Sequence, residues 1–343
     1  MMPRSPSPRI SGPSQSNNKK KILFLLSGES TTIPAAEASA LVRMRDPSAE
    51  VEAAEGRVLI ASSEADPDSI AGRIAFSKRV GSVIPDGKLD GDQLRSLREG
   101  TYRVNIFELG ERKKPDSGRL IADLAGEIGG RVSLRDPEYE VTVVRGAGGR
   151  DYFALSRPSL MRQDWVVRRP RARPFFHPAA IFPKLSRALV NLSRVDLGEV
   201  FFDPFCGTGS LLLEAHELGA APLGADRDQR MVKGALRNMH SFRQDWRGVV
   251  RADVRKCPVV AVDGMATDIP YGRASSTSGS KTSEVMENLL RTAAGLLREG
   301  RRLVVMHPDT DALDARGDFE IEEEHHLYIH SKLTRTISVL RRV

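Results

Sequence analysis

The sequence predicts an α/β protein in which a C-terminal domain with a doubly wound parallel sheet follows a separate α+β region. Three observations lead to this fold class. The chain has 343 residues, enough for about two domains of ordinary size. From residue 175 onward, apolar strand-like runs alternate with segments of helical periodicity, which is typical of repeated βα units. Before residue 157 the predicted elements are short and mixed.

The composition is that of a soluble, basic, globular protein. Hydrophobic residues make up 40% and charged residues 28% of the chain, which excludes a largely disordered chain, a collagen-like repeat and a disulfide scaffold. No apolar run approaches the roughly 18 residues of a membrane span. The two cysteines, Cys206 and Cys257, and the lack of an export signal predict a cytoplasmic protein. Lys and Arg (52) exceed Asp and Glu (45) by seven, which favours a nucleic acid partner.

The N-terminal part divides into a tail and an α+β region. Residues 1–20 are rich in Pro, Ser and Arg, which predicts a flexible basic tail. The region 21–156 is expected to contain both helices and strands, and a Gly-Gly pair at 129–130 ends its last helix. The expected strands are 22–26, 58–61, 101–109 and 139–144, and the expected helices are 34–42, 69–76 and 119–128.

An Arg- and Pro-rich linker is predicted over residues 157–174. It carries six arginines and three prolines, with Trp165, Phe175 and Phe176 nearby. Arginine beside aromatic rings suits contacts with phosphates and bases. A solvated linker between domains explains the same composition equally well, so both interpretations stay open.

The C-terminal domain, residues 175–343, is expected to be a doubly wound sheet that ends in an antiparallel hairpin. Such sheets bind ligands at the carboxyl ends of their strands. The expected strands are 200–202, 222–225, 249–252, 259–266 and 303–306, with 326–330 and 335–340 as the hairpin. The expected helices are 185–192, 208–218, 229–239 and 284–297.

A glycine-rich turn supplies the first chemical signal. The strand before it ends in Asp203, and Gly207 and Gly209 precede a helix. Glycines allow a tight turn and a close approach to a ligand, and a helix N-terminus attracts a carboxylate. The next strand ends in Asp226, which can accept both hydroxyls of a ribose. The pair predicts a nucleoside-type cofactor but does not separate NAD from S-adenosylmethionine.

The second signal is the segment Asp268-Ile269-Pro270-Tyr271-Gly272 at the end of another strand. It resembles the Asp-Pro-Pro-Tyr motif of methyltransferases that act on exocyclic amino groups of bases. Such an amino group is a poor nucleophile, because its lone pair is conjugated with the ring. A carboxylate (Asp268) and a backbone carbonyl (Ile269 or Pro270) that accept its two N–H bonds would favour attack. An aromatic face (Tyr271) would stack on the base.

Five segments together are similar to the archaeal tRNA guanine N2-methyltransferases that modify position 10 of tRNA and carry a THUMP domain. These segments are 173–178, 183–192, 203–209, 268–273 and 330–335. The resemblance covers the C-terminal half well. In the N-terminal half only the run 132–137 with 141–144 looks like the end of a THUMP domain. The resemblance implies a Rossmann-like class I methyltransferase domain behind a ferredoxin-like plus THUMP region that binds RNA.

The same resemblance implies roles for individual residues. Asp268, Pro270 and Tyr271 would be the catalytic residues. The donor contacts would fall on Asp203, Gly207, Gly209 and Asp226, with Asp253 at the adenine amino group and Phe176 shaping the pocket. Asp253 could equally be a solvated loop acid, and Arg273 either an RNA contact or a surface residue. Ile269 stands where the family has a proline. A looser turn there could change the rate of methyl transfer or the preference for a base.

The expected activity is methyl transfer from S-adenosylmethionine to guanine N2 in tRNA, with one or two methyl groups added. The sequence implies neither a metal nor a membrane partner, and a monomer is expected. Two alternatives stay open. The Asp-x-Pro-Tyr motif also suits adenine N6 or cytosine N4, and the chain could be a non-catalytic RNA-binding partner that keeps the fold.

Overall fold

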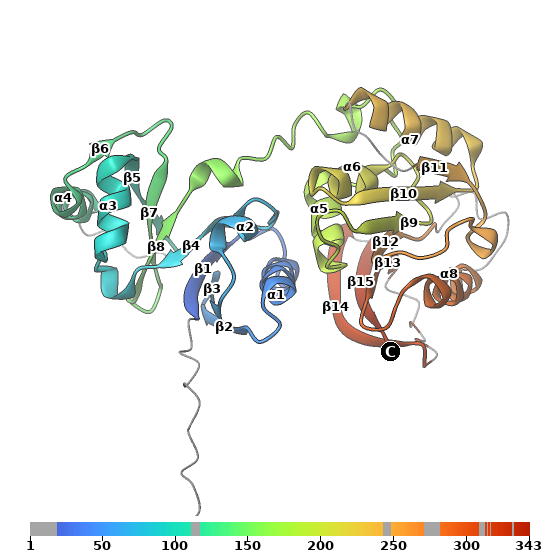
Figure 1. Cartoon of the computed structure of the whole chain (residues 1–343), viewed down its shortest axis with the longest axis horizontal. Coiled ribbons are helices and arrows are strands. Elements are labelled where there is room, and N and C mark those ends of the chain that lie inside the picture. Colours follow the sequence, from blue (N-terminus) through green and yellow to red (C-terminus); the bar gives the residue numbers. More distant parts are fainter. Residues whose placement is uncertain are drawn as a thin grey trace, which may run out of the picture.

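The structure consists of two lobes, each built around one sheet and joined by an extended linker (Figure 1). It is a computed structural model that describes residues 19–110, 117–242, 248–270, 282–308, 313, 315, 317–330 and 333–343. The predicted tail lies outside the described residues, apart from its last two positions. Among the helices of the described ranges, none is both long and apolar enough to cross a membrane.

The first lobe contains an eight-stranded sheet with the order β2-β3-β1-β4-β8-β7-β5-β6. β5 runs parallel to β6 and β7, and the other neighbours are antiparallel. Its strands are β1 (Lys20–Leu26), β2 (Glu50–Glu55), β3 (Val58–Ser63), β4 (Ser77–Val83), β5 (Thr101–Glu108), β6 (Arg131–Val132), β7 (Tyr139–Arg145) and β8 (Asp151–Ser156). Its helices are α1 (Ile33–Arg45), α2 (Pro67–Ala71), α3 (Gly91–Glu99) and α4 (Ser117–Ile128).

Alternation along β1 explains why this strand is central. Ile22 and Phe24 pack on one face against α1 and α2, whereas Leu23 and Leu25 pack on the other face against residues of β7 and β8. Because successive side chains of a strand point to opposite faces, a continuous apolar run fits a strand that is covered on both sides. The remaining helices, α3 and α4, pack with β5 and β7 in a separate apolar cluster.

The predicted helix 69–76 is wrong in its second half. α2 ends at Ala71, and the chain enters β4 at Ser77, which pairs with β1 and β8. β4 begins with the polar run Ser77-Lys78-Arg79, which has no apolar pattern typical of a strand. The strand is stabilised by pairing with its two neighbours. The sequence also failed to predict β2, β8 and α3.

The second lobe confirms the predicted doubly wound domain. Its seven strands have the order β11-β10-β9-β12-β13-β15-β14, parallel from β11 to β13, with β15 antiparallel to β13 and β14. The strands are β9 (Val200–Asp203), β10 (Ala221–Asp226), β11 (Gly248–Arg251), β12 (Gly264–Asp268), β13 (Arg302–Pro308), β14 (Phe319–His330) and β15 (Leu333–Arg342). The helices are α5 (Pro183–Leu192), α6 (Ser210–Glu217), α7 (Gln229–Ser241) and α8 (Thr282–Leu296). Short 3-10 turns occur at Pro85–Gly87, Pro158–Met161, Pro170–Ala172 and Val254–Lys256.

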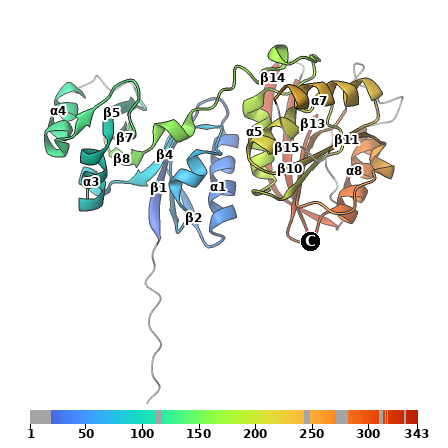
Figure 2. The ribbon, with the colours of Figure 1, turned by 45° about the horizontal axis from the view of Figure 1, so that its top comes forward.

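Helices cover both faces of this sheet (Figure 2). Phe201 packs with α5, α6 and α7, whereas its neighbour Phe202 packs with α8 on the opposite face. α7 crosses the linker's end so closely that a Cβ on Gly234 would lie 2.0 Å from the ring of Phe175. Three predicted bounds are wrong here. β12 begins only at Gly264 instead of residue 259, and α6 begins at Ser210, after the glycine turn. β14 begins at Phe319, seven residues before the predicted start at 326.

The two lobes share a core between α1 and α5. Ile33 and Ala36 of α1 belong to the same apolar cluster as Ala188 of α5. The buried carboxylate of Glu37 accepts the backbone N–H groups of residues 75 and 76 at 2.9 and 2.7 Å. It also accepts the side-chain amide of Asn191 on α5 at 2.7 Å. A buried carboxylate with three donors fixes α5 against the first lobe.

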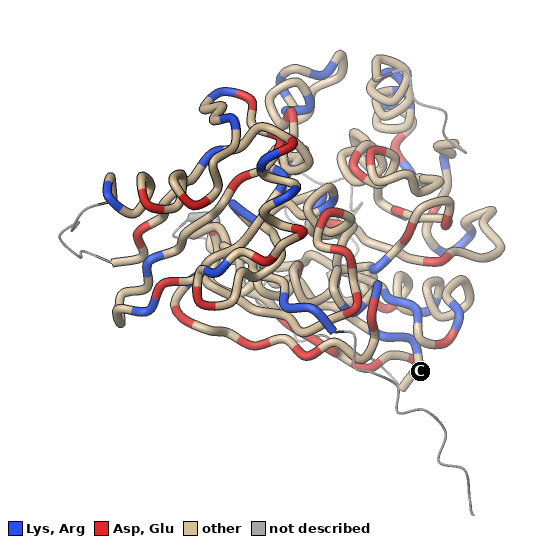
Figure 3. Tube along the Cα trace, turned by 60° about the vertical axis from the view of Figure 1, so that its left-hand side comes forward, with Lys and Arg blue, Asp and Glu red and all other residues tan. Residues whose placement is uncertain are grey.

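The linker arginines divide into buried and exposed ones. Arg168 and Arg173 are each 5% exposed, and Arg168 Nε donates to the carboxylate of Glu214 on α6 at 2.8 Å. Arg173 Nη1 donates to Ser210 Oγ, in the first turn of α6, at 2.6 Å. Arg169 and Arg171 are exposed. Lys and Arg alternate with Asp and Glu over both lobes (Figure 3), so the basic excess is not gathered in the linker alone.

Candidate active site

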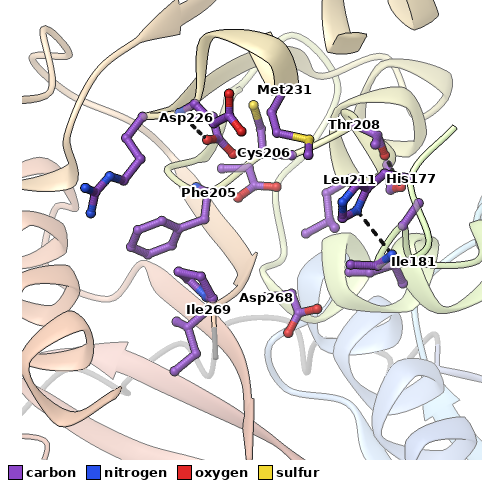
Figure 4. A pocket seen from close by; sticks show the side chains of 18 of the residues that line it. His177, Ile181, Phe205, Cys206, Thr208, Leu211, Asp226, Met231, Asp268 and Ile269 are labelled. Carbon is purple, nitrogen blue, oxygen red and sulfur yellow. Dashed lines mark hydrogen bonds between the residues drawn. The ribbon is translucent and has the colours of Figure 1, made fainter. Parts of the chain in front are cut away.

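A cavity of about 500 Å³ opens at the carboxyl ends of β9, β10 and β12 (Figure 4). This is the edge of a parallel sheet at which ligands bind in doubly wound folds. The volume lies in the range of small-molecule sites. The cavity is lined by Asp203, Phe205, Gly207, Thr208, Ser210, Asp226, Asp268, Ile269, Pro270, Arg335, His177 and nine further residues.

The glycine turn bounds one side of this cavity. Gly207 and Gly209 have φ of +50° and +80°, a backbone region that residues with a Cβ rarely adopt. The N–H of Gly207 donates to Asp226 Oδ2 at 3.0 Å, and the N–H of Asp228 donates to Oδ1 of the same carboxylate at 2.8 Å. Asp226 therefore fixes the turn from the next strand, and each of its oxygens keeps a lone pair for a ligand.

Asp203 lies at the floor of the cavity and is 1% exposed. Its Oδ1 accepts the hydroxyl of Thr267 at 2.6 Å and the N–H of Phe205 at 3.1 Å. Burial raises the pKa of Asp203 to about 7, against the lowering effect of these two hydrogen bonds. Burial also raises the pKa of Asp226. Asp203, Asp226 and Asp268 thus form a group of desolvated carboxyls, an environment that favours a cationic ligand.

Asp268, the last residue of β12, has two unlike oxygens. Oδ2 accepts a hydrogen bond from Arg335 Nη1 at 3.1 Å. Oδ1 is buried and has no hydrogen-bond partner among the described residues. Burial raises the pKa of Asp268 to about 7, although the charge and hydrogen bond of Arg335 lower it. A buried acceptor without a donor is costly, so Oδ1 is suited to receive an N–H from a ligand.

The residues after Asp268 are held by the neighbouring strand. Ile269 is 1% exposed, and its N–H donates to the carbonyl of Met306 on β13 at 3.1 Å. A proline, which the family has at this position, would lack that donor. Pro270 lines the cavity directly after it. Tyr271, the expected stacking residue, and Arg273 lie outside the described residues.

Two other predicted residues lie apart from the main cavity. Asp253 lines a smaller adjoining pocket, which shares Phe205 and Pro270 with the main one. Hydrogen bonds from Arg255, first of all those of its side chain, hold the pKa of Asp253 down to about 2. Phe176 is 44% exposed and is not part of either lining; the neighbouring His177 lines the main cavity instead.

No role was predicted for Arg335, although the residue lies in the segment 330–335 that resembles the family. The residue lies 67 positions after Asp268, and only the antiparallel course of β15 brings it to the cavity. Cys206 is buried in the turn, and burial raises the pKa of its thiol well above the usual value. It therefore packs as a neutral thiol. Within the described ranges, no three metal-ligating side chains gather at one point.

Comparisons with protein families, with curated proteins and with solved structures agree. The model of the UPF0020 family (RMKL-like, methyltransferase domain) matches residues 170–337. A tRNA (guanine(10)-N2)-dimethyltransferase of Methanothermobacter thermautotrophicus is 32% identical over 339 residues, covering 94% of this chain and 100% of that protein. One of Methanocaldococcus jannaschii is 29% identical over 361 residues and covers 93% and 99%. Among solved structures, TrmN from Thermus thermophilus is 19% identical with a TM-score of 0.50, covering 94% of this chain and 100% of that chain, which shows a shared fold.

Proposed function

The chain belongs to the family of archaeal tRNA (guanine(10)-N2)-dimethyltransferases, and we propose that it transfers methyl groups from S-adenosylmethionine to the N2 amino group of guanine 10 in tRNA. One observation carries this proposal most directly. The open oxygen of Asp268 lies in the same cavity as the glycine turn at residues 207–209. A donor held at the turn and a base held at Asp268 would therefore meet in one space.

The cavity suits the proposed donor in charge and shape. The donor supplies an electrophilic methyl group on a positively charged sulfur. Asp226, at the end of β10, would accept the ribose hydroxyls, and the N-terminus of α6 would face the donor's carboxylate. The buried carboxyls of Asp203 and Asp268 would favour the positive charge. Asp253, in the adjoining pocket, would reach the adenine amino group.

On the acceptor side, Asp268 would act on the amino group of guanine. Oδ1 would accept one N–H, and the carbonyl of Ile269 or Pro270 the other, which draws the nitrogen lone pair out of conjugation. After the nitrogen has gained the methyl group, it carries a positive charge and must lose a proton. Asp268 can take that proton and return it to solvent. N2 has two hydrogens and keeps one after the first transfer, so Asp268 would accept and then remove that remaining proton in a second round.

The first lobe and the linker would present the tRNA. We propose that residues 21–156 form the ferredoxin-like and THUMP region, that 157–174 link it to the methyltransferase domain 175–343, and that the enzyme works as a monomer in the cytoplasm. Arg162, Arg169 and Arg171 are exposed in the linker. Arg162 pairs with Asp136, and Arg169 and Arg171 would meet phosphates. The target base is stacked in folded tRNA and has to leave its stack to enter the cavity.

The decisive test is mass spectrometry of nucleosides from tRNA incubated with the protein and labelled donor. We expect methylated and then dimethylated guanosine at N2. Asp268→Asn, which keeps the shape but loses the base, should slow transfer by about 10²–10⁴-fold and leave donor binding measurable by calorimetry. Asp263→Asn is the matched control, because Asp263 precedes the other end of β12 and pairs with Arg301.

The same experiment separates the alternatives. Methylated adenosine or cytidine with unmodified guanosine would show that the target is adenine N6 or cytosine N4 instead of guanine N2. Donor and tRNA binding without any methylated product would instead indicate an RNA-binding partner that has kept the fold.

A further inference from the structure

Arg335 reaches the candidate active site from a strand that does not itself carry any of the predicted site residues. It belongs to β15, which is separated from β12 by β13. Its backbone pairs with Pro308 at the end of β13, while Asp268 pairs with Met306 of the same strand. From there Nη1 lies 3.1 Å from Asp268 Oδ2 and 3.7 Å from the sulfur of Met306. The side chain is 18% exposed and lines the cavity.

This contact treats the two oxygens of Asp268 differently. Oδ2 accepts from the guanidinium, and Oδ1 is buried with no donor among the residues that the structure describes. A carboxylate that rotated freely would present either oxygen to a ligand. Because Arg335 holds one of them, the other has a fixed direction before any substrate arrives, which is the preorganisation that an active-site acceptor requires.

The charge of Arg335 acts on the same carboxyl. Among the described residues, the cavity beside Asp268 is lined by charged or imidazole side chains from several elements: Arg335 of β15, Asp203 of β9, Asp226, Arg227 and Asp228 at the end of β10, Arg230 of α7, and His177 before α5. His307 of β13 hydrogen-bonds Ser338, and Arg187 of α5 pairs with the carboxylate of Glu214. Of the cations that the structure describes, Arg335 is the one that pairs with Asp268.

We propose that Arg335 is a positioning residue, which fixes one oxygen of Asp268 and so directs the other oxygen to the amino group of the target base. This inference rests on the proposed function. Its second consequence concerns protonation. The ionised carboxyl accepts an N–H more strongly than the neutral acid does, and only the ionised form can take up the proton that the amino group loses. Burial works against ionisation of Asp268. Removal of the guanidinium would leave burial unopposed and keep the carboxyl neutral to a higher pH.

The test is the pH dependence of single-turnover methyl transfer to tRNA between pH 6 and 8.5. Arg335→Gln removes the charge, and Arg335→Lys keeps it. We expect the acid limb of the Arg335→Gln profile to move up by at least about one pH unit. Transfer at pH 7 should fall by about fivefold or more and recover largely at pH 8.5. The Arg335→Lys limb should stay close to that of the wild type. Arg341→Gln, on the same strand but paired with Glu320, should leave the profile unchanged.

Donor binding by calorimetry and the thermal midpoint accompany each variant. A loss of rate that is equal at all pH values would overturn the proposal, because it would indicate a purely structural role. An unchanged Arg335→Gln profile would overturn it as well. If Arg335→Gln does not fold, Arg335→Ala with and without added methylguanidine replaces it, and a rate that the cation fails to restore counts against the proposal. Wild-type enzyme that forms no N2-methylguanosine would refute the proposed function itself.

Discussion

Glu214 is the residue whose replacement we expect to damage the fold most. It lies on α6 and is 0% exposed. Arg168 donates to it through Nε at 2.8 Å and Nη2 at 3.5 Å, and Arg187 donates through Nε at 2.9 Å. Arg187 Nη2 forms an ion pair with the same carboxylate at 2.8 Å. One buried carboxylate therefore pairs with two buried guanidinium groups, one from the linker and one from α5. Without it, both cations would stay buried without their nearest counter-charge, and Arg168 would keep only the more distant carboxylate of Glu217.

The expected cost follows from those contacts. Three charge-assisted hydrogen bonds are worth about 1.5–3 kcal/mol each relative to water. The measured cost of breaking a buried pair by removing one partner is about 3–5 kcal/mol. We therefore expect Glu214→Gln to lower the free energy of unfolding by about 3–5 kcal/mol, because the amide keeps the volume but not the charge.

Urea unfolding followed by circular dichroism measures this effect. The control is Glu217→Gln, one turn further along α6, whose carboxylate is 35% exposed and lies 3.6 Å from Arg168. That exposed pair should be worth about 1 kcal/mol or less. A Glu214→Gln variant within about 1 kcal/mol of the wild type would refute the reasoning, since the two arginines would then be tolerated without their partner.

Three further predictions concern the cavity and the packing around it. Burial raises the pKa of Asp203 and Asp268 to about 7, so both are largely neutral at pH 6 and ionised at pH 8. Calorimetry should show S-adenosylmethionine binding about three- to tenfold more tightly at pH 8, with a much smaller change for S-adenosylhomocysteine, which lacks the sulfonium charge. The same change of affinity with pH for both ligands would contradict this prediction. Gly234→Ala should cost about 1–3 kcal/mol in urea unfolding because its Cβ would meet an aromatic ring, whereas Gly295→Ala, which meets nothing within 4 Å, should stabilise by about 0.5–1 kcal/mol. Ile269→Pro restores the family motif but removes the N–H bond to β13, so the free energy of unfolding measured in urea should fall by about 1–3 kcal/mol. An unchanged free energy would contradict this prediction.

The architecture of the second lobe could be predicted from the sequence, because most of its helices and strands have a recognisable local pattern of apolar residues. Parallel strands that end in Asp203, Asp226 and Asp268 could be assigned from apolar runs, and the geometry of a doubly wound sheet then brings their carboxyl ends to one edge. The strands of the first lobe were harder to predict from the sequence. β4 begins with polar residues, and its strand character comes from β1 and β8 on either side. Such pairing depends on tertiary context rather than on propensity.

Contacts between distant segments were also hidden from the sequence. Arg335 meets Asp268 because β15 runs antiparallel beside β13, and no local pattern encodes that crossing. The linker arginines show the same limit. Arg168 and Arg171 look alike in sequence, yet one is buried against α6 and the other is exposed. Which of two neighbouring arginines finds a carboxylate is decided by packing.

The contact between α1 and α5 has a consequence for biosynthesis. Glu37 and Asn191, which bond across it, are 154 residues apart. At about 5–20 residues per second, a ribosome needs roughly 8–30 s to make the stretch between them. During that interval the apolar side of α1, with Ile33 and Ala36, has left the exit tunnel and has no α5 to cover it. The nascent chain therefore offers a binding surface to chaperones, and this surface disappears only when the catalytic lobe has emerged.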